Sequence, residues 1–207
     1  MTVLWKTKFA LTPNAAPFAI RAERASDVVA REALLDACFG ANRHTRTCQR
    51  LRDGRAPAEG VALSVVRQDG QERLVGTVRL WHVSAGGVPA LMLGPLAVDD
   101  SCRELGVGAA LMDQALAAAT ALGHGAVILL GDAPYYARFG FSPAKTGELA
   151  LPGPFERDRL LGLELRQGAL DGARGMIAPT GALLPDTVSK RQASRASKAA
   201  QLVPHAA

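Results

Sequence analysis

The chain lacks long apolar runs and paired-cysteine motifs, and it has few aromatic residues. Its three cysteines, Cys38, Cys48 and Cys102, are odd in number and none is spaced as CxxC. This argues against a disulfide framework or a zinc site, and it is typical of a protein in a reducing compartment. No apolar stretch reaches the roughly 18 residues that a membrane helix needs. We therefore expect a cytoplasmic protein with no signal peptide, no membrane partner and no bound metal.

Acidic residues are missing from the end of the chain, and this accounts for most of its positive charge. The formal net charge is +5, yet Lys190, Arg191, Arg195 and Lys198 follow Asp186 with no acid among them. The body of the protein is therefore close to neutral. Its basic isoelectric point does not indicate a nucleic-acid-binding fold, and we expect no nucleic-acid partner.

The length of 207 residues suits one domain with flanking segments. We expect an irregular segment over residues 1–17, a folded domain over 18–171 and a loosely packed or disordered basic tail over 172–207. Hydrophobic patterns predict the following strands: 18–23, 61–67, 73–83, 91–98, 126–130 and 160–165. Cap and periodicity signals predict helices over the following residues: 26–39, 42–53, 109–122 and a short one that Asp132 caps. Because a helix joins strands 91–98 and 126–130, we expect these strands to pair in parallel.

The stretch 91–111 combines a strand, a glycine loop and a helix. Gly106 and Gly108 let the main chain approach an anion closely, and the positive end of the following helix favours a phosphate. Two familiar phosphate loops do not fit. A Walker loop needs a lysine that does not follow Gly106, and the dinucleotide fingerprint needs a glycine at Leu111.

Two motifs together resemble a known family. The first is Arg-x-x-Gly-x-Gly after a strand ending Leu-x-Val, formed by Arg103, Gly106, Gly108, Leu96 and Val98. The second is Tyr135-Tyr136-x-Arg138-Phe139-Gly140-Phe141. Their combination resembles the GNAT N-acyltransferase superfamily, in particular its bacterial YhbS-like branch, most clearly over residues 93–143. The resemblance implies an α/β (α+β) fold in which helices flank a mixed sheet and acetyl-CoA lies between two splayed parallel strands.

The resemblance also implies which residues hold acetyl-CoA. Main-chain groups of Leu96 and Val98 would bond the pantetheine arm, and N–H groups from about Arg103 to Ala109 would cradle the pyrophosphate. The implied cofactor-binding residues are Leu96, Ala97, Val98, Arg103, Glu104, Leu105, Gly106, Val107, Gly108 and Ala109. Relatives commonly have glycine at the position of Glu104, whose carboxylate is unfavourable near phosphates unless it points outward.

Tyr136 matches the family's usual general acid, since it lies four residues before Gly140. A phenol, with an ordinary pKa of about 10, keeps its proton at neutral pH and can donate it to a leaving thiolate. A merely structural tyrosine is the alternative. The general base is open, with Asp99 and His82 as candidates. Cys102 could in principle carry the acyl group, although direct transfer is the family's habit.

The resemblance implies an acyl-CoA-dependent N-acyltransferase, most simply one that moves acetyl to the primary amine of a small molecule or peptide in a ternary complex. The alternative is a non-catalytic acyl-CoA-binding or regulatory module. The arginine cluster from Arg43 to Arg55 forms either a solvated face or an acceptor site for acidic substrates. The sequence fixes neither the acceptor nor the oligomeric state, and a homodimer is one option.

Overall fold

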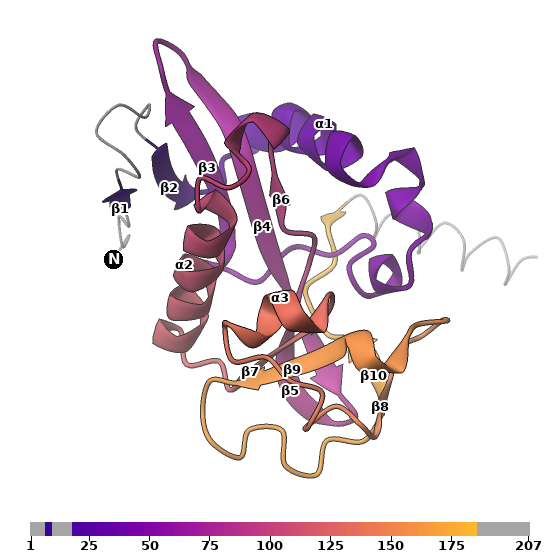
Figure 1. Cartoon of the computed structure of the whole chain (residues 1–207). Helices are drawn as coiled ribbons and strands as arrows, with labels where there is room; N and C mark the ends of the chain where they lie inside the picture. Colours follow the sequence, from indigo (N-terminus) through magenta and orange to yellow (C-terminus); the bar gives the residue numbers. More distant parts are fainter. Residues whose placement is uncertain (1–6, 10–17, 186–207) are drawn as a thin grey trace, which may run out of the picture.

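A mixed sheet of ten strands organises the part of the chain that the computed structural model describes, residues 7–9 and 18–185 (Figure 1). Its main path is β1-β2-β3-β4-β5-β7-β9, and β6, β8 and β10 attach beside it. The strands are β1 Thr7–Phe9, β2 Phe18–Ala22, β3 Ala62–Gln68, β4 Glu72–Ala85, β5 Val88–Leu93, β6 Ala97–Val98, β7 Ala126–Leu130, β8 Leu149–Ala150, β9 Leu160–Glu164 and β10 Gly175–Pro179.

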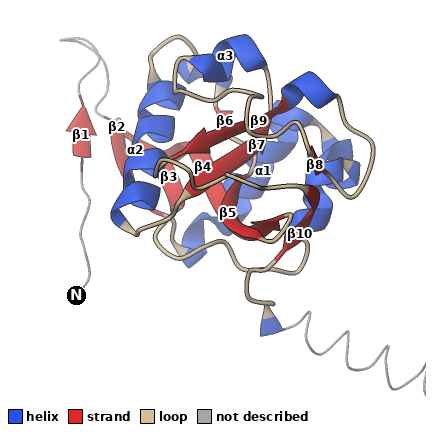
Figure 2. Ribbon diagram, turned by 90° about the horizontal axis from the view of Figure 1, so that it is seen from below, coloured by secondary structure: helices blue, strands red, loops and turns tan. Residues whose placement is uncertain are grey.

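The middle of the sheet confirms the expected change from antiparallel to parallel pairing. Neighbouring strands from β1 to β5 pair antiparallel, and β4 is the longest strand. β5 and β7 then pair in parallel, but only through Leu91–Val127 and Met92–Ile128. The ladder is short because the chain after β5 leaves β7. Figure 2 shows β5, β7 and β9 side by side.

Helices cover both faces of this sheet (Figure 1). Helix α1, Val28–Phe39, packs its Leu34 and Leu35 on Ala97 and Leu74. Helix α2, Val107–Ala121, packs on the neighbouring Val75, whose side chain faces the other way along β4. Short α3, Ala133–Ala137, follows β7, and Asp132 caps it by accepting a hydrogen bond from the N–H of Tyr135 at 3.2 Å.

A bulge separates β5 from β6, so the expected continuous strand 91–98 is wrong in its middle. Leu93 pairs with Leu80 and Ala97 pairs with Thr77, so residues 94–96 span the distance that residues 78–79 span on β4. One extra residue on a strand bends it and disrupts its ladder. Gly94 permits the bend because a Cβ there would lie 2.0 Å from Trp81 Cζ3. The bulge steers β6 onto β4 and away from β7.

Three expected segments need correction. The residues 175–179, expected in a loosely packed tail, form β10, which pairs with β4 and β8 and buries Ile177 completely. The expected helix 42–53 is two 3-10 helices, η2 Ala41–Thr45 and η3 Thr47–Leu51, because Arg46 between them is extended. Within the expected irregular segment 1–17, Thr7–Phe9 form β1.

The basic tail residues lie outside the described part of the chain. Within residues 18–185, each helix is too short or too polar to span a bilayer. In the same range no three histidine, cysteine, aspartate or glutamate side chains gather in a way that could hold a metal ion.

Candidate active site

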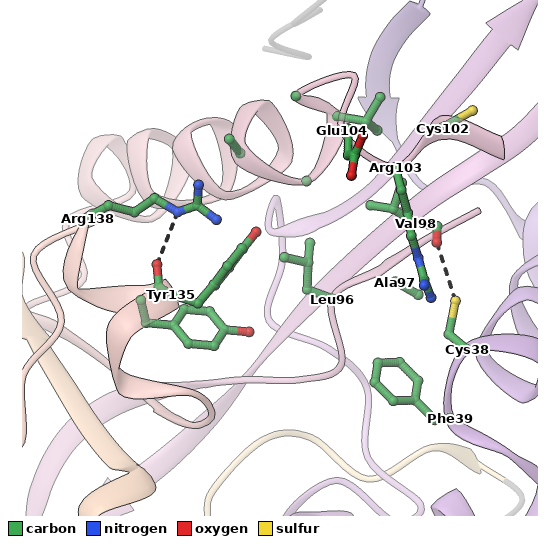
Figure 3. A pocket seen from close by; sticks show the side chains of 15 residues that line it. Cys38, Phe39, Leu96, Ala97, Val98, Cys102, Arg103, Glu104, Tyr135 and Arg138 are labelled. Atoms are coloured by element: carbon green, nitrogen blue, oxygen red, sulfur yellow. Dashed lines mark hydrogen bonds between the residues drawn. The ribbon is translucent and has the colours of Figure 1, made fainter. Parts of the chain in front are cut away.

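A cleft of about 490 Å³ opens where β6 diverges from β7 (Figure 3). We call it the donor cleft. The start of α2 and the loop before it form one wall, and α1 and α3 contribute side chains. Its lining residues are Cys38, Phe39, Leu96, Ala97, Val98, Cys102, Arg103, Glu104, Gly106, Val107, Gly108, Ala109, Tyr135, Tyr136 and Arg138. Of the implied cofactor-binding residues and Tyr136, the structure leaves only Leu105 outside this lining, because its side chain packs on the core.

The N-terminus of α2 faces this cleft with free backbone donors. Gly106 is its N-cap in the left-handed conformation, with φ 75°, and no side chain caps this end. The first N–H groups of a helix have no partner within the helix, so they and the helix dipole favour an anion. Gly108 keeps the wall open. A Cβ there would lie 3.4 Å from the Tyr135 hydroxyl and 3.5 Å from Val98 Cγ2.

Glu104 is strained in this loop. Its φ is 65°, and it is the one non-glycine residue with a positive φ in the described ranges 7–9 and 18–185. Such a conformation costs a residue with a Cβ about 1–2 kcal/mol. This explains physically why a glycine suits the position. The side chain is exposed at the rim of the cleft, so its carboxylate is solvated rather than buried beside the anion site.

Strand β6 presents a free edge to the cleft. One edge pairs with β4 through Val98–Gly76 and Ala97–Thr77, and no strand in the described part of the chain pairs with the other. The Val98 carbonyl accepts a hydrogen bond from Cys38 Sγ at 3.4 Å (Figure 3). A carbonyl has two lone pairs, so this thiol leaves room for a second donor. An extended ligand could therefore bond β6 as an added strand would.

Tyr136 lies beside this edge in an apolar setting. Its ring meets Tyr135 edge-on at 4.9 Å and Phe141 at 6.0 Å between centroids. A Cβ on Gly131 would lie 2.3 Å from the Tyr136 ring, so that position must be glycine. Burial, with smaller contributions from Tyr135 and Asp132, raises the pKa of Tyr136 to about 12. The phenol therefore stays protonated throughout the neutral range.

Tyr135 has a different environment. The Arg138 guanidinium lies over its ring at 3.9 Å, and Arg138 Nε donates to the Tyr135 carbonyl at 3.1 Å (Figure 3). Its hydroxyl reaches the first turn of α2, as the geometry at Gly108 shows. The two adjacent tyrosines thus occupy separate parts of the cleft wall.

A second cavity of about 820 Å³ adjoins the donor cleft, and we call it the acceptor cavity. The two share four lining side chains, those of Phe39, Leu96, Tyr135 and Tyr136. The second cavity extends from them to η2, η3, the end of β7 and the loop before β9. Its charged lining residues are Arg43, Arg46, Arg52, Asp132, Glu156 and Arg159. No sequence pattern singled out Phe39, Glu156 or Arg159, because they come from segments far apart in the chain.

The arginine cluster is not a uniformly solvated face. Arg43 is 9% exposed and bonds Asp36 at 2.7 Å and Glu32 at 2.5 Å. It therefore fastens η2 to α1. Arg46 and Arg50 are exposed, whereas Arg52 is partly buried. Arg55 is partly buried and donates a hydrogen bond to the Gly181 carbonyl. The cluster therefore contains structural residues as well as exposed ones, and Arg43, Arg46 and Arg52 line the acceptor cavity.

The candidate bases are not in the shared region. Asp99 accepts a hydrogen bond from Ser101 N at 3.0 Å and pairs with Arg73 at 3.4 Å, and the hydrogen bonds from Ser101 lower its pKa. His82 contacts His124, with ring centroids 5.4 Å apart. Neither residue lines either cavity. Cys102 lines the donor cleft but is only 1% exposed, so it is poorly placed to carry an acyl group.

Comparison with known proteins identifies the fold. Residues 59–143 match the model of the acetyltransferase (GNAT) domain. The chain is 29% identical over 161 residues to the uncharacterized N-acetyltransferase YhbS of Escherichia coli K12. This alignment covers 76% of this chain and 93% of YhbS. A crystal structure of E. coli YhbS in complex with CoA aligns with a TM-score of 0.67 at 27% identity, covering 83% of this chain and 94% of that one.

A more distant structure shows the fold alone. A GNAT-family acetyltransferase from Staphylococcus aureus Mu50 aligns with a TM-score of 0.52 at 16% identity, covering 72% of this chain and 99% of that one. The expected architecture, a mixed sheet with helices on both faces, is confirmed by these matches and by the strand order.

Proposed function

We propose that the chain is a GNAT acetyltransferase that transfers an acetyl group from acetyl-CoA to a primary amine, in keeping with the family match over residues 59–143. One observation carries the proposal. The donor cleft has an anion site at one end and Tyr136 at the other, and Tyr136 is also where the acceptor cavity begins. A thioester that enters from one side therefore meets an amine that enters from the other.

The donor would bind mainly through the main chain. The N–H groups of the first turn of α2, around Gly106 and Gly108, would hold the pyrophosphate. The free edge of β6, through Leu96 and Val98, would hold the pantetheine arm as an added strand. The CoA in the YhbS crystal structure supports this assignment, because that protein aligns over most of this chain.

Direct transfer in a ternary complex requires little side-chain chemistry. The uncharged amine nitrogen attacks the thioester carbonyl carbon and forms the C–N bond. The C–S bond then breaks, its electron pair goes to sulfur, and the nitrogen loses its extra proton. Main-chain N–H groups at the β6 edge are suitably located to stabilise the oxyanion.

Tyr136 would supply the proton at sulfur. A phenol with a pKa of about 12 is a weaker acid than a thiol, whose ordinary pKa is about 8.5, so full transfer to the thiolate alone is uphill. The transfer becomes favourable when the C–S bond breaks, because the nitrogen then belongs to a protonated amide, which is a strong acid. Its proton would leave through water by way of the lining carboxylates Asp132 and Glu156 and return to the Tyr136 phenolate, which restores the phenol.

Two measurements test the proposal. Titration calorimetry with acetyl-CoA should give saturable binding, and a thiol assay should show CoA release that depends on added amine across a panel of amino acids, peptides and polyamines. Absence of acetyl-CoA binding would refute the proposal. Tight binding with no release for any amine would instead support a non-catalytic acyl-CoA-binding module.

A further inference from the structure

The Arg52 side chain makes no hydrogen bond and no ion pair within the residues that the structure describes, although it is partly buried. It follows η3, and its Nε is shielded from solvent without a hydrogen-bond acceptor. Its guanidinium lies over the Trp81 ring at 5.4 Å. The nearest carboxylate along the chain, Asp53, bonds Gln49 instead. Burial lowers the pKa of Arg52 below its ordinary value.

Most of the other charged side chains that line the acceptor cavity have partners within the described part of the chain. Arg43 is paired with Glu32 and Asp36. Arg159 pairs with Glu156 at 3.6 Å, and Asp132 caps α3. Arg46 is exposed and lies over the Phe39 ring at 5.3 Å, at the boundary with the donor cleft. Two positive charges in this cavity are therefore left without an acidic partner. Arg52 is the partly buried one and Arg46 is the exposed one.

A second unpaired donor lies next to Arg52. Trp81 is 6% exposed, and its Nε1 also lacks an acceptor. Both residues line a neighbouring cavity of about 190 Å³, and Arg52 lines the acceptor cavity as well. A shielded donor without an acceptor is destabilising, and more so when it is charged. An anionic group on a ligand would remove this cost, because a guanidinium binds a carboxylate or phosphate with two parallel hydrogen bonds.

We propose that Arg52 selects acceptors that carry an anionic group, a carboxylate or a phosphate, in addition to the amine that is acetylated. The inference rests on the proposed function, since it names the acceptor class of the same site. The anionic group binds Arg52 in the wall of the acceptor cavity, and the amine points toward Tyr136. Arg46 adds to the attraction from the entrance side. Polyamines and other purely cationic amines are then poor substrates.

Matched ligands separate charge from shape. Several amino acids would be compared with their carboxamides and their decarboxylated amines, and O-phosphoethanolamine with ethanolamine, by CoA release. We expect kcat/KM to be at least about 10-fold higher for the anionic member of each pair, because a hydrogen bond to a charged group contributes about 1.5–3 kcal/mol. Equal kcat/KM values within all pairs would overturn the inference. The pair with the larger ratio of kcat/KM, carboxylate or phosphate, identifies the anionic group that the site prefers.

Three variants assign the preference to Arg52. Arg52→Met should lower kcat/KM for anionic acceptors about 10–100-fold more than for neutral acceptors, while Arg52→Lys should retain part of the preference. Arg166→Met, at an exposed arginine outside both cavities, is the matched control and should change nothing. The melting temperature of Arg52→Met should be equal or higher, because an unpaired shielded charge is removed. An equal loss for all acceptors, or a lower melting temperature, would indicate a structural residue.

A binding measurement keeps this test separate from catalysis. N-acetylated amino acids and their carboxamides would be titrated by calorimetry into the wild type and Arg52→Met. The acids should bind more tightly than the amides in the wild type alone. If acetyl-CoA does not bind but this preference holds, the proposed transfer fails and the anion site stands. If acetyl-CoA is turned over and the preference is absent, the anion site fails and the transfer stands.

Discussion

The donor cleft and the acceptor cavity lie side by side, but main-chain groups dominate the first and side chains dominate the second. The donor cleft is formed mostly by one stretch of chain, residues 96–109, and it offers main-chain edges and helix N–H groups. The acceptor cavity is formed by side chains from segments as far apart as η2 and the loop before β9. A main-chain site tolerates many sequences and suits a constant ligand. A side-chain site varies with each substitution and suits a ligand that differs among relatives.

The largest effect should come from closing the donor cleft at Gly108. Gly108→Val places two methyl groups where phosphate must approach the main chain, next to Tyr135 and Val98. We expect acetyl-CoA affinity to fall by at least about 100-fold, on the order of 3 kcal/mol, in calorimetry. Gly108→Ala is the graded control and should cost much less, because its Cβ makes only close van der Waals contacts. Unchanged affinity in Gly108→Val would mean that the anion site lies elsewhere.

Tyr136→Phe tests the junction of the two regions. It removes the hydroxyl that we propose as proton donor but keeps the ring against Tyr135 and Phe141. We expect kcat to fall about 100-fold while acetyl-CoA affinity changes less than about 3-fold. Tyr135→Phe is the neighbouring control, with a smaller effect on kcat. An unchanged kcat in Tyr136→Phe would leave Tyr136 as a structural residue.

The pH dependence of turnover provides an independent check on Tyr136. Its pKa is raised to about 12, so the phenol holds its proton at every pH below that value. Loss of this proton therefore cannot lower the rate between about pH 6 and 10. Initial rates over this range should give profiles of the same shape for the wild type and Tyr136→Phe. An alkaline decline below pH 10 that disappears in the variant would contradict the raised pKa.

A substitution away from both cavities, at Asp27, should lower the free energy of unfolding and leave the donor cleft and the acceptor cavity unchanged. The buried Asp27 carboxylate bonds Arg21 at 2.6 Å and Ser64 Oγ at 3.1 Å, and the hydrogen bonds from Arg21 lower its pKa to about 2. Because the folded-state pKa is lowered, the ionised carboxylate stabilises the fold fully at pH values above its ordinary pKa of 3.8. This stabilisation is lost as the pH falls through about 2. Asp27→Asn should therefore cost roughly 2 kcal/mol at pH 7 and about half of that at pH 3.

Urea unfolding at the two pH values measures this difference. Asp69→Asn is the control, since Asp69 pairs with Arg67 at the surface and should contribute less than about 1 kcal/mol. A cost for Asp27→Asn that does not depend on pH would assign the effect to hydrogen bonding rather than to charge.

The smallest effect is expected at Glu104, whose φ of 65° favours glycine. Glu104→Gly should raise the free energy of unfolding by about 0.5 kcal/mol, because relief of strain exceeds the added chain entropy. Glu104→Gln removes the charge but keeps the strain. If only Glu104→Gly is more stable and both variants bind acetyl-CoA a few-fold more tightly, strain and charge act separately. Equal stability of all three proteins would show that the loop accommodates the side chain freely.

The same contrast explains what the sequence could and could not predict. The glycine loop and the Asp132 cap depend on neighbours within one local segment, so their pattern predicted them. The β5–β7 parallel pairing was predicted from the helix that connects the two strands. The bulge after Leu93 depends on Trp81 from another strand, and β10 depends on a pairing partner 92 residues earlier, Ile177 with Ala85. Such features follow from tertiary contacts that no short window contains. The acceptor cavity is a feature of this kind.

Trp81 has a consequence for both regions. Its indole lies against Gly94, where the strand bends to open the donor cleft, and its face carries the guanidinium of Arg52. One rigid ring therefore sets the spacing between the bend beside the donor cleft and the guanidinium that we propose as the anion site. Acceptors should then be discriminated by length as well as by charge, since an acceptor that is too short or too long cannot place its anionic group at Arg52 and its amine near Tyr136 at the same time.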